Sequence, residues 1–406
     1  MVDTSEDPVT PDVLIALQLR TINDPWLPRL RRFDCQGATE EFIPFIPLFL
    51  TRKTTVICIV FAEDTPAIVV ALAISRLPLL CPDLDDIALN ILPRDPAITE
   101  AVSEVLLACN PNTLRNFEVD SPLTEEAREV VYRLPRLSNL WAIIQGPISL
   151  PTVALPSLTT IDIEYGADMN WLQGFRGAGL EKLETITFRT ESDHIGDFLG
   201  TFESVALTTS VQNALSEFRF YTSRSWNPNY SSLLSFNKLK EVEIEFSCGG
   251  GCSSRIDDDT IGNLAQTMPK LEVLRLGKAP CSTRTGITVN GLIGLACRCP
   301  RLSELRIHFQ ATTLVEAATS ATTPSPSDKP VSRWVDCSLA KLEVGRIPIP
   351  ARSGLAVAHI LLQIFPRLLD VGYANPDWKT VAETIKDFRR IGGFVHRSSK
   401  PHPTHI

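Results

Sequence analysis

The sequence lacks an apolar run long enough to cross a bilayer, and it lacks an excess of basic charge. Its longest apolar run, from Pro66 to Ile74, is about half of the roughly 20 residues that a spanning helix needs. The formal net charge is -8, from 39 basic and 47 acidic residues, which argues against nucleic acid or an anionic membrane surface as the main partner. We therefore expect no membrane span, no membrane partner and no nucleic-acid partner.

The start of the chain also lacks the features of a secretory signal. The segment MVDTSEDPVTPD is acidic and has neither the basic start nor the apolar core that such a signal requires. Ten cysteines in 406 residues is a modest density, and without a signal the default is reduced thiols. We expect a cytoplasmic or nuclear protein.

Motifs of catalysis and of metal binding are missing too. No G-x-S-x-G, H-E-x-x-H or Rossmann glycine pattern occurs, and the glycines of SCGGGCSS are not followed by the G-K-[ST] of a phosphate loop. Cys248 and Cys252, with Cys297 and Cys299 further on, do not show the paired two-residue gaps typical of zinc sites. We predict that the protein is not an enzyme and has no catalytic residue, no cofactor and no metal site.

What the sequence does contain is an internal repeat. Three segments align without gaps as P-x-L-x-x-L-x-L: LPSLTTIDIEY from Leu155, MPKLEVLRLGK from Met268 and CPRLSELRIHF from Cys299. The L-x-x-L-x-L frame, with other apolar residues allowed, recurs about every 28 residues, which is typical of leucine-rich repeats. The frame begins at Leu30, Leu84, Leu114, Leu137, Leu158, Leu183, Leu215, Leu239, Leu271, Leu302, Leu339 and Leu368, with a weaker copy at Thr54.

Each copy predicts a strand that is followed by a helix. A strand turns alternate side chains to opposite faces, so the two apolar residues of L-x-L enter the interior together. The segments 257–267 and 286–298 have apolar residues at helical spacing, and the acidic run 257–259 is predicted to cap the first of them. A proline before the first leucine, as in Pro269 and Pro300, is predicted to end the preceding helix.

The predicted fold is therefore α/β, a leucine-rich-repeat solenoid with a curved parallel sheet on the concave side and helices on the convex side. We predict a single solenoid of about 13 repeats over residues 13–391. Residues 1–12 are predicted to be disordered and residues 392–406 to form a flexible tail. The Ala-, Thr-, Ser- and Pro-rich stretch 311–330 is predicted to be a low-complexity loop insertion, its second half exposed.

Several local strings resemble the leucine-rich-repeat region of fungal F-box proteins. They are LPRDPAITEAVSEVLLACNPNTLRNFEVDSPLTEEAREVVYRLPRLSNLW, NWLQGFRGAGLEKL, IEFSCGGGCSSRIDDDTI, and SLAKLEVGRIPIP followed by LLQIFPRLLDV. The resemblance covers roughly residues 10 to 390, and it implies that the repeats hold a protein substrate while an F-box docks onto the linker subunit of a cullin ubiquitin ligase. No F-box motif is evident before Leu30, so the linker subunit is an expected partner only if an F-box is supplied.

The concave face of a solenoid is its usual binding surface, so the outward residues of the predicted strands are the candidate site. In chain order they predict an acidic stretch, a mixed aromatic zone and a basic C-terminal stretch, which would suit a partner of complementary charge. Tryptophan, tyrosine and arginine are also enriched at binding hot spots. The candidate residues are Trp141, Asp162, Glu164, Arg189, Arg219, Tyr221, Glu243, Glu245, Arg275, Arg306 and His308.

Three functions remain open at this point. The first is a non-catalytic substrate-recognition or scaffold protein of the F-box type, related to cullin ubiquitin ligases, with a protein partner of unknown identity. The second is a repeat protein that regulates or inhibits a bound enzyme, such as a small GTPase regulator, with no link to ubiquitin. The third is a domain whose F-box is encoded upstream of Met1.

Overall fold

The fold is α/β, and the described residues form thirteen parallel strands that follow one another in the sheet in chain order. The computed structural model describes residues 15–16, 26–91, 94–144, 155–165, 180–192, 195, 198–209, 211–224, 228–246, 256–277, 286–321, 337–344, 346–350 and 352–398. The chain divides into two compact units. Unit 1 comprises residues 1–194 and 204–214, and unit 2 comprises residues 195–203 and 215–406.

Unit 1 contains the first seven strands and the helices between them. Its strands are β1 (Arg32–Ala38), β2 (Val56–Phe61), β3 (Asp86–Asn90), β4 (Asn116–Pro122), β5 (Asn139–Ile144), β6 (Thr160–Tyr165) and β7 (Thr185–Thr190). Its helices are η1 (Ile43–Phe45), α2 (Ile46–Phe49), α3 (Ala67–Ser75), α4 (Leu77–Leu80), α5 (Pro96–Ala108) and α6 (Glu125–Val131).

Unit 2 contains the remaining six strands. These are β8 (Glu217–Thr222), β9 (Glu241–Glu245), β10 (Val273–Leu276), β11 (Glu304–Arg306), β12 (Lys341–Val344) and β13 (Asp370–Tyr373). Its helices are η4 (Tyr230–Ser235), α8 (Asp258–Thr267), α9 (Val289–Arg298), α10 (Ala311–Ala321), α11 (Gly354–Ile364), η5 (Pro376–Trp378) and α12 (Lys379–Ser398). Helix α7 (Phe198–Thr209) is divided between the units, with residues up to 203 in unit 2 and the rest in unit 1, and η3 (Val211–Asn213) belongs to unit 1.

The predicted frame marks the strands closely: all thirteen strands begin two residues after the first residue of a copy. The first leucines from Leu84 to Leu368 are at most 1% exposed. The weaker copy also fits, because Thr54 is buried and its hydroxyl donates to the carbonyl of Leu30 in the preceding copy (3.1 Å). The prediction of one strand per copy is confirmed.

The proline at the end of three helices has the predicted effect. The residue before a proline is restricted to extended or bridging backbone. Met268, Cys299 and Phe365, each followed by proline, have φ between -115° and -123° and ψ between 63° and 77°. In each case a backbone N–H three residues further on, at the first leucine of the next copy, closes a turn onto their carbonyl at 3.0 to 3.1 Å. The proline therefore ends the helix and directs the chain into the strand.

The acidic run before α8 caps two helices. The Asp257 side chain accepts from the backbone N–H of Thr260 (2.9 Å), as predicted for the helix that directly follows. Asp258 instead accepts from the backbone N–H groups of Thr288 (2.7 Å) and Gly291 (3.1 Å) at the start of α9. A Cβ atom on Gly291 would lie 2.4 Å from the Asp258 carboxylate, so this close approach requires glycine. The second cap links neighbouring repeats and was not predicted.

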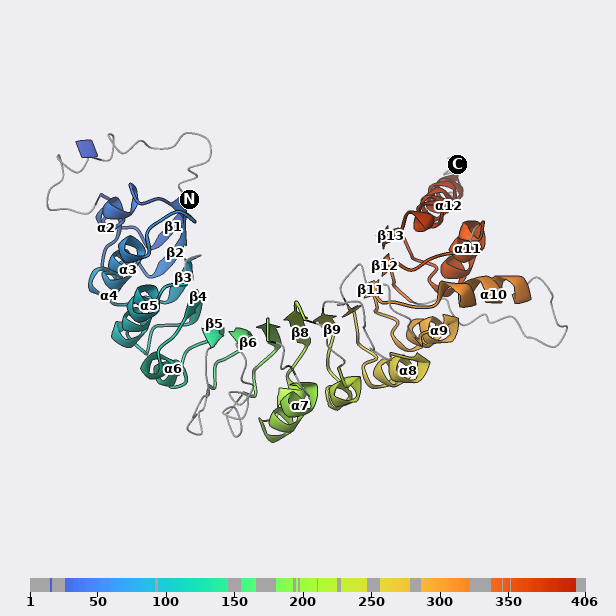
Figure 1. Cartoon of the computed structure of the whole chain (residues 1–406), viewed down its shortest axis with the longest axis horizontal. Coiled ribbons are helices and arrows are strands. Elements are labelled where there is room, and N and C mark those ends of the chain that lie inside the picture. The colour runs from blue at the N-terminus through green and yellow to red at the C-terminus, as the bar shows by residue number, and fades with distance from the viewer. Residues whose placement is uncertain are drawn as a thin grey trace, which may run out of the picture. The chain divides into compact units, whose positions relative to one another are not determined.

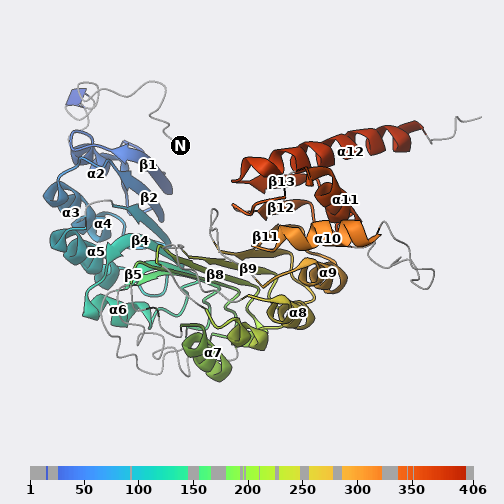
Figure 2. The same ribbon diagram turned by 45° about the vertical axis from the view of Figure 1, so that its right-hand side comes forward.

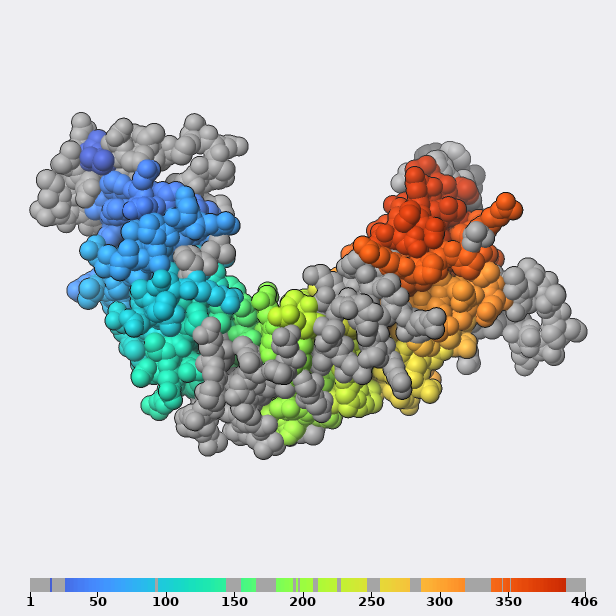
Figure 3. All heavy atoms as spheres, in the orientation of Figure 1, coloured from blue at the N-terminus to red at the C-terminus, as the bar shows by residue number. Residues whose placement is uncertain are grey.

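In each unit the helices lie on one side of the strands (Figures 1 and 2). Among the described residues, no helix covers the other side of the sheet, which we call the open face. In the space-filling view, the described residues of unit 1, coloured blue to green, form a continuous surface (Figure 3). None of the described helices is long and apolar enough to span a membrane.

Two predicted boundaries are wrong. Residues 311–321 of the predicted loop insertion 311–330 form helix α10, with Leu314 fully buried, and residues 322–330 lie outside the described residues. The predicted tail from Gly392 is helical as far as Ser398, because α12 continues through both glycines. Residues 1–12 and 399–406 lie outside the described residues.

Candidate functional site

The open face is lined by alternate residues of each strand. In β6, Ile161, Ile163 and Tyr165 are buried on the helix side, while Thr160, Asp162 and Glu164 are half-buried on the open face. Neighbouring strands are in register, so equivalent positions of successive copies stand side by side in rows. The chemistry of each open face therefore depends on which side chains meet within and between these rows.

In unit 2 the open face carries a network of ion pairs centred on Glu243 of β9. Glu243 is only 6% exposed, accepts from the hydroxyl of Tyr221 (2.8 Å) and binds the Arg275 guanidinium (3.0 Å). Arg275 also makes a two-nitrogen contact with the carboxylate of Glu304 at 2.7 and 3.2 Å. Arg219 bridges to Glu241 at 3.1 Å. The buried carboxylate is thus held by donors from both neighbouring strands.

The network extends across β11 and β12. Arg306 binds the Glu245 carboxylate on one side and Glu343 at 2.6 Å on the other. Lys341 lies between Glu304 (2.9 Å) and Glu343 (2.6 Å). In the described part of unit 2, six carboxylates and four cations are connected in this way: Glu217, Glu241, Glu243, Glu245, Glu304 and Glu343 with Arg219, Arg275, Arg306 and Lys341.

The pairing shifts the pKa values of two carboxyl groups of the network, Glu304 and Glu343, toward their charged forms. The hydrogen bond from Arg275 lowers the pKa of Glu304. Burial acts in the opposite direction but is the smaller effect, so the pKa lies below its usual value. Burial opposes ionisation of Glu343, but hydrogen bonds from Lys341 and Arg306 outweigh it and lower its pKa. Burial and the bond to Glu243 raise the pKa of Tyr221, so this phenol stays protonated and acts as a donor. The network is a set of fixed charges at neutral pH.

Seven of the predicted site residues lie in unit 2. Six of them belong to this network, and the seventh, His308, does not. His308 is half-buried, and burial, with a smaller effect of Arg306, lowers its pKa to about 4, so the ring is neutral at pH 7. Its Nδ1 atom is buried and has no hydrogen-bond partner among the described residues. The six residues in the network are Arg219, Tyr221, Glu243, Glu245, Arg275 and Arg306.

The predicted basic C-terminal stretch is wrong. Arg275 and Arg306 were expected to present free positive charge, but each binds carboxylates on both sides within the sheet. Two of these carboxylates, Glu304 and Glu343, come from β11 and β12 themselves. The open face of unit 2 is therefore a mixed, internally paired surface.

The open face of unit 1 contains the other four predicted residues. Arg189 of β7 makes a two-nitrogen contact with Asp162 of β6, at 2.7 and 3.1 Å. Glu164 of β6 pairs with Arg94, which precedes α5. Trp141 of β5 is half-buried, and its indole nitrogen is buried without a partner among the described residues. The sequence predicts that these four residues lie on adjacent strands, and in the structure they do.

Three further carboxylates lie on this face and are not in any ion pair among the described residues. The side chain of Asn116 lowers the pKa of Asp86 of β3, against the larger effect of burial, and Asp120 of β4 accepts a hydrogen bond from the backbone N–H of Ile91 (2.5 Å). Glu118 of β4 is exposed and has no hydrogen-bond partner within the described ranges. Burial raises the pKa of all three carboxyl groups.

Sequence reasoning missed these carboxylates, although the same frame contained the signal. Asp86 stands two residues after Leu84, and Glu118 and Asp120 stand four and six residues after Leu114. The candidate residues all belong to copies that begin at Leu137 or later, whereas these three carboxylates belong to earlier copies. Glu343, four residues after Leu339, belongs to a later copy and is also absent from the candidate residues.

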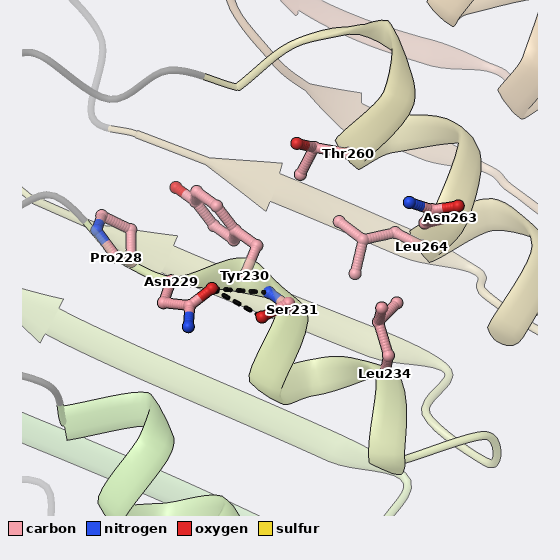
Figure 4. Close-up of a pocket in the computed structure, with 8 residues that line it drawn as sticks. All are labelled: Pro228, Asn229, Tyr230, Ser231, Leu234, Thr260, Asn263 and Leu264. Carbon is pink, nitrogen blue, oxygen red and sulfur yellow. Dashed lines mark hydrogen bonds between the residues drawn. The ribbon is translucent and has the colours of Figure 1, made fainter.

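A small cavity lies on the helix side of unit 2, between η4 and α8 (Figure 4). Its volume is about 240 Å³. The Asn229 side chain accepts from the backbone N–H (3.3 Å) and hydroxyl (2.6 Å) of Ser231, which caps η4. No side chain that ionises near neutral pH lines it, so the cavity offers no acid or base for catalysis. The lining residues are Pro228, Asn229, Tyr230, Ser231, Leu234, Thr260, Asn263 and Leu264.

Cysteines and acidic residues form no cluster of metal ligands within the described part of the chain. Cys299 is buried, and its thiol lies 3.6 Å from the carbonyl of Met268, whereas Cys297 is exposed. Cys248 and Cys252 lie outside the described residues. Comparison of the chain with protein-family models and with curated proteins gives no match.

Proposed function

We propose that this chain is a leucine-rich-repeat protein that binds another protein through the open face of its sheet and catalyses no reaction. The observation that carries the proposal is the row of polar, charged and aromatic side chains on a face that no described helix covers. Side chains of these types, held on a rigid parallel sheet, suit recognition of a complementary surface. The L-x-x-L-x-L frame and its spacing support the repeat class.

Within this class we propose a substrate-recognition or scaffold role of the F-box type. The support is the resemblance of the repeat segments to those of fungal F-box proteins. In that role the repeats hold a protein substrate, and a cullin-ligase linker subunit is a second partner where an F-box is supplied. Binding would act by surface complementarity, without a covalent step.

Site-specific photo-crosslinking tests the proposal. A photo-reactive amino acid would be placed on the open face at Thr160 and, separately, at Val273, both half-buried strand residues. Matched positions on the helix side are Leu79 and Leu355, which are 81% and 62% exposed. Each variant of the full chain would be irradiated in fungal cell lysate, and crosslinked proteins would be identified by mass spectrometry.

Protein partners crosslinked from Thr160 or Val273, but not from Leu79 or Leu355, are the expected result. Cullin-ligase subunits among the co-purified proteins would support the F-box type. Their absence, with a partner still bound on the open face, would favour a regulator of a bound enzyme instead. Crosslinks confined to Leu79 and Leu355 would overturn the choice of face.

A further inference from the structure

The open face of unit 1 differs from that of unit 2 in its charge balance. On β3 to β7 the carboxylates are Asp86, Glu118, Asp120, Asp162 and Glu164, whereas the cations bound to them are Arg94 and Arg189. Arg94 binds Glu164 and Arg189 binds Asp162, both carboxylates of β6. Asp86, Glu118 and Asp120 are in no ion pair among the described residues, and Arg32 and Arg94 act on Asp86 and Asp120 only as weaker, more distant charges. The face over β3 and β4 therefore carries more negative than positive charge among the described residues.

An aromatic side chain stands in the middle of this negative region. In the register of the sheet, Trp141 of β5 lies directly between Glu118 of β4 and Asp162 of β6. Neighbouring strands are about 4.8 Å apart, so both carboxylates are within reach of a group that rests on the indole ring. The next residue in this row, on β3, is Ala88, whose short side chain leaves space beside Glu118.

The arrangement matches what a lysine or arginine side chain requires. A cation over an indole ring is attracted by the ring, and a flanking carboxylate adds a charge-assisted hydrogen bond. Burial raises the pKa of Glu118, and so do Asp86 and Asp162, the two charged groups that act on it. A bound cation would relieve this repulsion, whereas a bound anion would increase it.

We propose that the open face of β3 to β6, centred on Trp141, is a docking surface for an extended lysine- or arginine-rich segment of a partner protein. This inference rests on the proposed function and specifies the chemistry of its partner. The occupant is assigned by charge complementarity. A second copy of this chain is a poor fit, because its net charge is -8. A metal ion is also a poor fit, since no metal-ligand cluster occurs among the described residues.

Fluorescence anisotropy with the full chain tests the inference. The probe is a fluorescein-labelled peptide of alternating lysine and serine, and the control peptide has glutamate in place of lysine. The lysine peptide should bind, the glutamate peptide should not, and added salt should weaken binding because it screens the charges. Glu118→Gln should weaken binding about fivefold, the effect of one partly exposed ion pair.

The aromatic contribution is tested at Trp141. Trp141→Ala should weaken peptide binding about tenfold, which corresponds to a central aromatic contact. Because the half-buried side chain also packs in the sheet, Trp141→Phe serves as a second variant that keeps a ring and should weaken binding about threefold. The matched control is Glu104→Gln, an exposed residue of α5 in the same unit, which removes the same charge from the helix side and should leave binding unchanged.

The outcomes separate this inference from the proposed function. Equal loss of binding in Glu118→Gln and Glu104→Gln would mean that net charge alone attracts the peptide, and would overturn the docking surface. Absence of binding, with partners still crosslinked from Thr160, would overturn the inference and leave the proposed function standing. Binding that is unaffected by both Trp141 variants would also overturn it.

Discussion

The open faces of the two units are built from the same repeat, but they differ in how their carboxylates are paired. In unit 2 the carboxylates of β8, β9, β11 and β12 are bound by arginine or lysine, including Glu243, which is almost fully buried. In unit 1, Asp86, Glu118 and Asp120 have no ion-pair partner among the described residues, and their pKa values are raised. On the unit 2 face each of these carboxylates has a cationic partner, whereas on the unit 1 face three carboxylates have none among the described residues.

This difference indicates different roles for the two faces. Ion pairs in a partly buried network fix side-chain positions, and removal of one partner leaves a charge without compensation. Unpaired carboxylates on a rigid sheet contribute nothing comparable to folding, and repulsion between them opposes it. We therefore expect substitutions on the unit 2 face to affect stability, and substitutions on the unit 1 face to affect binding.

The largest expected effect is at Arg275, the cation shared by Glu243 and Glu304. Arg275→Ala should lower the free energy of unfolding by about 2 to 3 kcal/mol, because it leaves the buried Glu243 carboxylate undercompensated. Urea denaturation followed by tryptophan fluorescence measures the change. The matched variant is Arg189→Ala in unit 1, whose ion pair with Asp162 is more exposed and should contribute less than about 1 kcal/mol. Equal losses in the two variants would contradict the contrast between the faces.

A smaller effect, with a defined pH dependence, is expected at Glu304. Its pKa is lowered in the folded state, so the ionised group stabilises the fold above its unfolded pKa of about 4.3, and this contribution is lost as the pH falls through the folded pKa. Glu304→Gln should therefore be less stable than the native chain by about 1 to 2 kcal/mol at pH 7, the contribution of charge-assisted hydrogen bonds. The difference in the free energy of unfolding between the variant and the native chain should narrow below about pH 4. A gap that is constant between pH 7 and pH 3 would rule out the ionised carboxylate as its cause.

The positions of the strands could be predicted from the sequence because the signal is local. Each copy contains two apolar residues at positions i and i+2, and a strand turns both side chains to the same face. This holds without any contact to the rest of the chain. The helix at Ala311–Ala321 was not predicted, because the signal for it is not local. Its threonines and serine suggested a loop by composition, whereas burial of Ala311 and Leu314 against the repeat decides for a helix.

The ion-pair network could not be predicted, because its partners come from different copies. Arg306 and Glu343 are 37 residues apart, and Arg275 and Glu243 are 32 apart. Repeats of unequal length hide which residues become neighbours, so the frame gives each residue's face but not its partner. This is why the arginines of β10 and β11 were expected to be free positive charge.

The smallest expected effect has the opposite sign and lies on the face of unit 1. The pKa of Glu118 is raised by burial and by Asp86 and Asp162, so ionisation of this group costs more in the folded state than in the unfolded state. The cost is absent below the unfolded pKa of about 4.3 and present above the folded pKa. Glu118→Gln should therefore be slightly more stable than the native chain at pH 7, by a few tenths of a kcal/mol because water screens an exposed group. Thermal denaturation at pH 7 and at about pH 4 measures the difference, which should disappear at the lower pH. Loss of stability at pH 7 would mean that Glu118 takes part in the fold, as Glu304 does, and that the two faces do not differ in the way proposed.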